Sequence, residues 1–329
     1  AMAGTALVAC QAPVAPGAGS EGAVPAAESV ELTMWGWTDL IWEHIMEQFE
    51  EQHPGITVNL TELGDIVFGD QKFLTAVAAG TGPDVAIQNR HTFLQFAAKG
   101  LYSDVTPKFE STGLTPDDFT PVQLAESSWE GSIYGLPLNT DVRYLYWNTD
   151  AFEEVGLDPT QPPTTWEELG DYTEKLNLKD SNDNFERIGF VPYLFGNSWM
   201  WLYGFLNKAP AISEDKRTIL CDDERWIYTM DWMVDFYDQY IGDFELANAY
   251  SEAATSAGLG EPFVAGKVAM VADGDWTVGS LLRSPSFEWD TAPMPIPPGG
   301  EQSTWSCGFS LVMPPSVKSP DEAWELMRW

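Results

Sequence analysis

The chain has 329 residues, of which 44% are hydrophobic and 13% aromatic, enough for a large buried core and for two domains. It carries 50 acidic residues against 16 lysines and arginines, so its formal net charge is −34. This charge would repel nucleic acid and anionic lipid surfaces, and we expect no nucleic-acid partner. A neutral or cationic ligand is favoured instead.

The N-terminal stretch has the composition of a processed leader. Residues 1–9 are small and apolar and run into the sequence LVAC, which resembles the lipobox of bacterial lipoproteins, although four residues can also match by chance. A Pro- and Ala-rich stretch follows over residues 11–28. We therefore expect residues 1–28 to be a clipped lipoprotein signal remnant and a flexible tether, with a lipid on Cys10. The lipid would be the sole membrane anchor, because no later segment approaches the roughly 20 apolar residues of a membrane span.

Hydrophobic periodicity predicts five elements after the tether. Apolar residues alternate with polar ones over 30–34 and again over 56–60, which predicts two strands. Four-residue spacing over 41–49 predicts a helix between them, and a second helix is expected over 73–79. The sequence DVAI over 84–87 predicts a buried third strand. The order β-α-β-α-β indicates an α/β lobe with a mostly parallel sheet.

Ligands of such sheets bind beyond the carboxyl ends of the strands. Residues 35–39, within the sequence WGWTDLIW, and residues 88–91 follow two of the predicted strands. Side chains at these positions would face a ligand bound in the crevice. Trp35, Trp37 and Asp39 are therefore candidate ligand contacts, whereas Trp42, on the helix, is expected in the core.

The middle of the chain predicts two further helices, over residues 166–176 and 223–240. One face of the second carries Trp226, Met230, Met233 and Tyr237 at helical spacing, which indicates core packing. Trp199 and Trp201 lie in a stretch whose polar neighbours interrupt the pattern, and we expect them in a loop facing a cleft. Cys221 and Cys307 lie in no CxxC pattern, and two free buried thiols are favoured over a disulfide.

Seven segments together resemble the extracytoplasmic solute-binding proteins of ATP-binding-cassette importers, in particular the carbohydrate-binding group that includes maltose-binding protein. They occur in the family's order and span nearly the whole chain after the tether. The segments are FEEQHPGITV, AAGTGPDVAIQN, LYSDVTP, GSIYGLPLNTDVRYLYWNTDAFEEVGL, TTWEEL, FVAGKVAMVADGDW and WSCGFSLVMPPSVKSPDEAWELM.

The resemblance implies the two-lobed periplasmic-binding-protein fold of type II. Each lobe would be a mostly parallel sheet flanked by helices, with a hinge between the lobes. Residues 29–144 and 307–329 would form the first lobe, and residues 145–306 the second lobe with the return crossing. Family members continue well beyond the segment that ends here at Trp329, so we expect the chain to be a C-terminally truncated fragment.

The resemblance also supplies ligand-binding candidates. Trp276 matches a position where relatives stack an aromatic ring on the sugar, with Asp275 beside it, and Trp305 lies on the return crossing. Packing is the alternative role for these tryptophans, a solvated loop for residues 88–91, and a hinge ion pair for Asp141 with Arg143. The full set from the resemblance and the loop prediction is Gln88, Asn89, Arg90, His91, Asp141, Arg143, Trp199, Trp201, Asp275, Trp276 and Trp305.

An enzyme is the competing class, most naturally a glycoside hydrolase, which needs two carboxyl groups at a defined separation. The sequence marks no such pair, has no GxSxG motif and places none of its three histidines in HExxH. We therefore expect a non-catalytic protein without metal or cofactor, located outside the cytoplasm on the cell membrane or in a periplasm.

The expected receptor is a monomer that closes on a neutral mono- or oligosaccharide and delivers it to the permease subunits of an importer. The alternatives are a receptor of the same fold for a polyamine or another cationic solute, and, less favoured, a secreted glycoside hydrolase.

Overall fold

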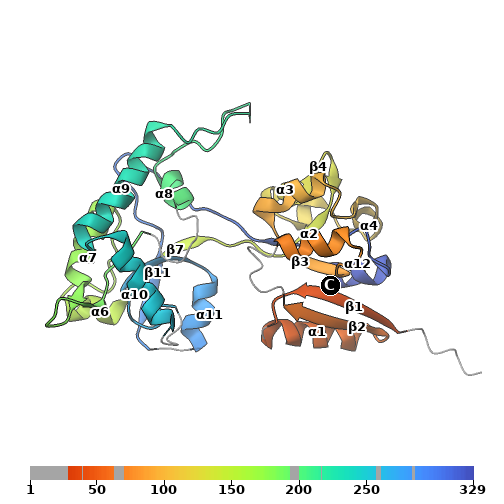
Figure 1. Cartoon of the computed structure of the whole chain (residues 1–329), viewed down its shortest axis with the longest axis horizontal. Helices are drawn as coiled ribbons and strands as arrows, with labels where there is room; N and C mark the ends of the chain where they lie inside the picture. The colour runs from red at the N-terminus through yellow and green to blue at the C-terminus, as the bar shows by residue number, and fades with distance from the viewer. Residues whose placement is uncertain are drawn as a thin grey trace, which may run out of the picture.

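The computed structural model describes residues 29–38, 40–62, 70–192, 200–215, 217–256, 261–283 and 286–329. The chain forms two lobes that lie side by side along its longest axis and are joined by two segments (Figure 1). No helix of these ranges is long and apolar enough to cross a membrane. The predictions for Cys10, Asp39 and Trp199 lie outside the described residues.

The first lobe contains a five-stranded sheet with the order β2-β1-β3-β12-β6. Strand β1 pairs in parallel with β2 and β3, which confirms the three strands predicted from periodicity, while β12 is antiparallel to both β3 and β6. The first three strands are parallel as expected, but the sheet as a whole is mixed, with two parallel and two antiparallel pairings. Its strands are β1 (Val30–Gly36), β2 (Ile56–Glu62), β3 (Val85–Asn89), β6 (Gly135–Pro137) and β12 (Phe309–Val312).

Helices cover the sheet of the first lobe, and the late helix α12 returns to pack against β1 and β3 (Figure 1). Trp324 of α12 is 2% exposed and joins Leu32, Met34 and Phe49 in one core, so α12 and the first elements of the chain belong to the same lobe. The remaining elements of this lobe are α1 (Leu40–Gln52), α2 (Asp70–Ala78), α3 (Arg90–Ala98), α4 (Thr106–Ser111), η1 (Pro116–Asp118), α5 (Pro121–Glu126), β4 (Ser128–Trp129), β5 (Ser132–Ile133) and α12 (Pro320–Arg328).

The second lobe departs from the prediction of a mostly parallel sheet. Its described three-stranded sheet has the order β10-β7-β11, with β10 (Met270–Gly274) and β11 (Trp289–Ala292) both antiparallel to β7 (Arg143–Asn148). β10 and β11 run in the same direction and are connected through α11 (Trp276–Arg283). β7, which enters from the first lobe in the opposite direction, lies between them and makes every pairing antiparallel.

Helices predicted in the middle of the chain are present, including α7 (Trp166–Leu176) and α9 (Glu224–Tyr240). Asp223 caps α9 by accepting the Arg225 N–H at 3.0 Å. The buried face of α9 contains Trp226, Met233 and Tyr237, but Met230 is 42% exposed because it lies at the edge of that stripe. The other elements of the lobe are α6 (Thr149–Glu154), β8 (Leu178–Lys179), β9 (Phe185–Arg187), α8 (Met200–Leu206) and α10 (Phe244–Ser256).

The two segments that join the lobes, residues 138–143 and 304–309, run antiparallel and are bonded to each other. Leu138 N–H donates to the Phe309 carbonyl at 2.9 Å, and Asp141 N–H donates to the Cys307 carbonyl at 3.2 Å. Further along, the Arg143 N–H donates to the Thr304 hydroxyl at 2.9 Å. The paired segments form a narrow hinge between two bodies that each have their own cores.

Candidate functional site

A cavity of about 460 Å³ opens between the lobes beside the hinge. It lies beyond the carboxyl ends of β1 and β3, where α/β sheets place their ligand crevice. Its volume is within the range of small-molecule sites. The described residues that line it are Trp37, Trp42, Asn89, His91, Asn139, Asp141, Arg143, Trp276, Trp305, Cys307 and Phe309.

Two tryptophans of the sequence WGWTDLIW form the first-lobe wall of the cavity. The Trp37 ring meets Phe309 edge-on with centroids 4.8 Å apart and lies 5.8 Å from the Trp42 ring. Trp37 was the predicted contact. Trp42 packs against the first-lobe core as expected, and it lines the cavity as well. Trp35 does not line it: inside the paired strand β1, its ring packs on the core with the Lys72 ammonium 5.0 Å above it.

Residues 88–91 divide between the cavity and the interior, because Gln88 and Asn89 point to opposite faces of strand β3 and helix α3 begins at Arg90. Asn89 and His91 line the cavity, with the Asn89 carboxamide capping α3 by accepting the His91 N–H at 3.1 Å. Gln88 is only 3% exposed and accepts a bond from the Tyr102 hydroxyl at 3.1 Å. The structure thus places half of this predicted group at the cavity.

Arg90 was a candidate ligand contact in the sequence, but it does not line the cavity. It contacts the segments that join the lobes instead. Its side chain is 2% exposed and pairs with Glu126 at 3.1 Å. Its guanidinium donates to the Asn139 carbonyl at 2.9 Å and to the Cys307 carbonyl. One buried cation therefore holds both joining segments against the first lobe.

The floor of the cavity includes Asn139 and Cys307, which the sequence did not mark. Asn139 accepts the Phe309 N–H at 2.9 Å through its side chain. The Cys307 thiol lies 3.6 Å from His91 Nδ1, a spacing that resembles a nucleophile with its base. Burial raises the pKa of that thiol, so it stays protonated at neutral pH and is a poor nucleophile. Cys307 is free and buried as predicted, whereas Cys221 is free but exposed.

An ion pair and two indoles form the hinge side of the cavity. Arg143 pairs with Asp141, and both side chains are less than a tenth exposed. The Asp141 carboxylate also accepts the Cys307 N–H at 2.6 Å. The Arg143 guanidinium carbon lies 4.3 Å from the Trp305 ring centroid and 5.1 Å from that of Trp276. The Asp141–Arg143 ion pair therefore lies at the hinge and also lines the cavity. These are the two positions that the sequence left open as alternatives.

Two predicted contacts of the second lobe do not line the cavity. Asp275 is exposed outside the lining, and the neighbouring Asp273 is the carboxylate that organises the start of α11. Burial raises the pKa of Asp273, while hydrogen bonds from the Gly274 N–H, Thr277 and Trp276 oppose the rise. Trp201 lies on helix α8 and not in a loop, and its ring meets Trp226 edge-on at 5.1 Å.

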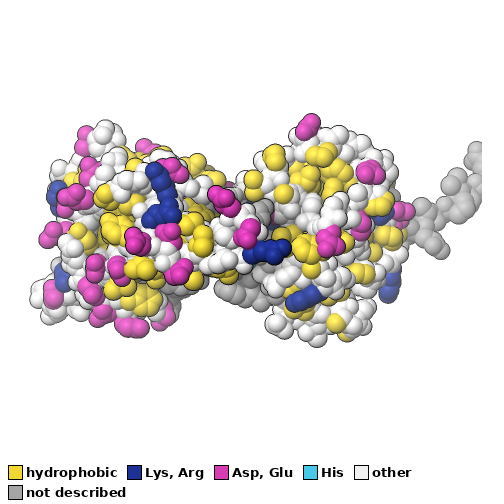
Figure 2. Space-filling model, turned by 90° about the horizontal axis from the view of Figure 1, so that it is seen from above, with side chains coloured by type: hydrophobic (Ala, Val, Ile, Leu, Met, Phe, Trp, Pro, Cys, Tyr) yellow, Lys and Arg dark blue, Asp and Glu magenta, His cyan; other side chains and the backbone are white. Residues whose placement is uncertain are grey.

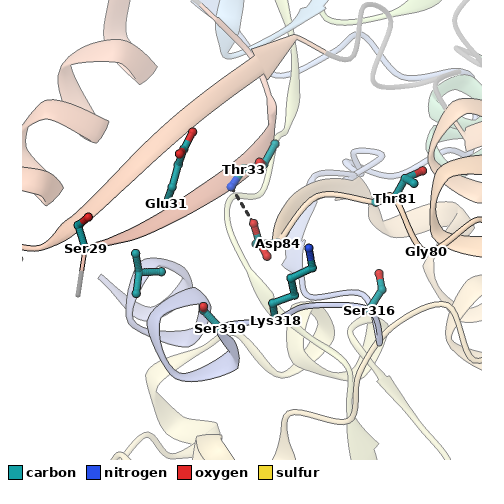
Figure 3. Close-up of a pocket in the computed structure, with 11 residues that line it drawn as sticks. Ser29, Glu31, Thr33, Gly80, Thr81, Asp84, Ser316, Lys318 and Ser319 are labelled. Atoms are coloured by element: carbon teal, nitrogen blue, oxygen red, sulfur yellow. Dashed lines mark hydrogen bonds between the residues drawn. The ribbon is translucent and has the colours of Figure 1, made fainter. Parts of the chain in front are cut away.

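A second hollow, of about 560 Å³, lies at the opposite end of β1. Hydroxyl groups surround it, and the Asp84 carboxylate, which accepts the Thr33 N–H at 2.8 Å, points into it together with Lys318 (Figure 3). This hollow lies at the amino end of a strand and belongs to the first lobe alone. The interlobe cavity, at the carboxyl ends, is the better candidate site. On the face that Figure 2 shows, acidic side chains are spread over both lobes.

Comparison with known families identifies the chain. The model of the family described as "Bacterial extracellular solute-binding protein" matches residues 35–329. The chain belongs to this family. The family is one of extracellular solute-binding proteins, which agrees with the binding class and the extracytoplasmic location expected from the sequence.

Curated relatives are distant. A Brucella abortus (strain 2308) protein named as a binding protein is 26% identical over 313 residues, which cover 87% of this chain and 67% of that protein. The sn-glycerol-3-phosphate-binding periplasmic protein of Pectobacterium atrosepticum is 28% identical over 137 residues, or 40% of this chain and 31% of that protein. These matches support the binding class and leave the ligand open.

Solved structures confirm the two-lobed fold. CpMnBP1 with mannotriose bound has a TM-score of 0.78 and 25% identity, over 92% of this chain and 77% of that chain. A Thermotoga lettingae solute-binding protein of an ABC transporter, bound with α-D-tagatose, has a TM-score of 0.76 and 26% identity, over 91% and 76%. The maltose-bound Thermotoga maritima protein MalE3 shares the fold with a TM-score of 0.74, at 21% identity over 91% of this chain and 76% of that chain.

Proposed function

We propose that this protein captures a neutral mono- or oligosaccharide in the interlobe cavity and delivers it to the permease subunits of an ATP-binding-cassette importer. The observation that carries the proposal is a single cavity with indoles on both sides and amides on its floor. Trp37 and Trp42 stand on the first-lobe wall, and Trp276 and Trp305 on the other. Such rings suit the C–H patches of a pyranose, and Asn89 and Asn139 offer donors and acceptors for its hydroxyls.

The charges of the cavity support an uncharged ligand. Among the described lining residues, Asp141 is the carboxylate and Arg143 the guanidinium, and they neutralise each other. A polyamine would need several carboxylates facing the cavity, and a phosphate ester would need a cation that is not already paired. The net charge of −34 suggested a cationic solute, but the residues that line the cavity favour an uncharged one.

The bound sugars of similar structures agree with this chemistry. The neighbours at 25% and 26% identity hold mannotriose, mannobiose and α-D-tagatose, all of them neutral. We infer that a ligand of this kind contacts both walls and stabilises a closed arrangement of the lobes through the hinge. Closure would then present one distinct form of the protein to the importer.

Membrane anchoring through Cys10 is part of the same proposal. It is supported by the sequence LVAC and the tether that follows it. Labelled fatty acid should be incorporated into the wild-type chain in bacterial cells and lost in Cys10→Ala. Equal labelling of the two would remove the anchor from the proposal and leave the binding function untouched.

Calorimetric titration tests the ligand class. Mannobiose, mannotriose, maltose and D-tagatose should be compared with sn-glycerol 3-phosphate and spermidine under one set of conditions. We expect saturable heat from at least one saccharide and none from the charged compounds. Saturation by spermidine alone would move the function to a cationic solute, and saturation by the phosphate ester alone would refute the argument from paired charges.

A further inference from the structure

Gly274, the last residue of β10, lies directly under the Trp276 ring. A Cβ atom at this glycine would be 2.1 Å from Cζ3, 2.3 Å from Cη2 and 2.5 Å from Cε3 of the indole. Real Cβ contacts are never so short, so the benzo ring occupies the space that any other residue would fill. The backbone conformation does not demand glycine here. The requirement for glycine at this position comes from the tryptophan.

The strand pairing holds this glycine in place. Gly274 pairs with Arg143 across β10 and β7, and its carbonyl accepts the Tyr146 hydroxyl at 2.8 Å. Gly274 is buried, whereas Trp276 is 42% exposed. The buried glycine therefore supports an indole that is itself partly open and lines the cavity.

Arg143 is the second residue that contacts the Trp276 indole. Its guanidinium lies near both the Trp276 and Trp305 rings, at 5.1 and 4.3 Å, and it is held by the buried Asp141. A planar guanidinium stacks on aromatic rings in a way that a lysine ammonium does not reproduce. The ion pair thus ties the positions of both indoles to the hinge segments.

We propose that Gly274 and Arg143 are positioning residues that set the orientation of Trp276, and that ligand affinity depends on them through this indole. The inference rests on the proposed function insofar as it concerns affinity. Its structural part, that Gly274 and Arg143 determine where the Trp276 ring lies, holds for the ligand-free protein as well.

Gly274→Ala is the direct test, and Gly279→Ala is its matched control. Gly279 lies on the same helix as Trp276, and a Cβ there would meet only the end of Arg283 at 3.4 Å, an ordinary contact. We expect Gly274→Ala to change the near-ultraviolet circular dichroism of the ligand-free protein and to weaken binding of the saccharide found by titration about tenfold or more. Gly279→Ala should match the wild type in both. Arg143→Lys, which keeps the charge beside Asp141, should weaken binding with the same spectral change.

A double variant separates positioning from a general structural role. If Gly274 acts through the indole, Gly274→Ala combined with Trp276→Ala binds no more weakly than Trp276→Ala alone. An additive loss of affinity would overturn the inference, and so would a Gly274→Ala protein with wild-type spectrum and affinity. A wild-type protein that binds no saccharide would refute the proposed function instead. The circular dichroism spectra would still test whether Gly274 and Arg143 position the Trp276 ring.

Discussion

Replacing Trp276 by alanine removes the most exposed indole of the interlobe cavity while leaving the cores of both lobes intact. The residue is 42% exposed, which for an aromatic side chain of roughly 250 Å² corresponds to about 100 Å² open to a ligand. Covering all of that area would contribute ~2.5 kcal/mol at ~25 cal/mol per Å², and covering half would contribute ~1.3 kcal/mol. We therefore expect the dissociation constant of the saccharide to rise about 10- to 70-fold.

Calorimetric titration of the variant measures this change, and Trp329→Ala is the matched control. Trp329 is also 42% exposed, but its ring packs against Phe49 at the outer end of the first lobe, 5.6 Å between centroids. Trp329→Ala should bind the saccharide as the wild type does. An unchanged dissociation constant for Trp276→Ala, or an equal loss for both variants, would refute the role assigned to Trp276.

The other predictions concern stability and pH. Arg90→Met removes the cation that holds both joining segments and should lower the free energy of urea unfolding by about 2–4 kcal/mol. The control Arg283→Met, on the surface, should change it by less than about 0.5 kcal/mol. Equal effects of the two substitutions would contradict the hinge role of Arg90. Trp324→Ala, in the first-lobe core, should lower the free energy of unfolding by about 3–5 kcal/mol. The folded variant should retain its saccharide affinity in titrations. Loss of affinity without loss of stability would be inconsistent with a core role. Burial raises the pKa of Asp273 above its unfolded value, so its contribution to stability is largest below the ordinary carboxyl pKa and declines as pH rises to the raised value. Urea unfolding across that acidic window should therefore show wild-type stability falling with pH relative to Asp273→Asn, and a difference that rises with pH would reverse the sign of the argument.

Periodicity predicted the positions of the early strands and helices of the first lobe because elements such as β1 bury one regular face. Leu32 and Met34 alternate in β1, and the apolar spacing of α1 leads to the buried Phe49. The second-lobe sheet was mispredicted because strand direction depends on where the chain enters a lobe. β7 enters from the hinge and lies between β10 and β11. The local sequence pattern of a strand does not predict which strands it pairs with or in which direction.

The candidate site was predicted in outline and not in detail. Trp37, Trp276 and Trp305 lie at strand ends or crossings, and the structure gathers them around one cavity. Gln88 and Arg90 were indistinguishable from Asn89 and His91 in the sequence, because all four side chains are polar. Which of them face the cavity depends on where strand β3 ends and helix α3 begins. Asn139 and Cys307 were missed because their position depends on the pairing of the two joining segments, which are separated by more than 160 residues.

Small-angle X-ray scattering, with and without the saccharide that gives heat on titration, tests the central claim most directly. The account requires a ligand that touches both walls of the interlobe cavity and draws the lobes together about the paired segments. It predicts a smaller radius of gyration at saturating saccharide and no change with spermidine. A saccharide that binds with measurable heat and leaves the scattering unchanged would contradict it.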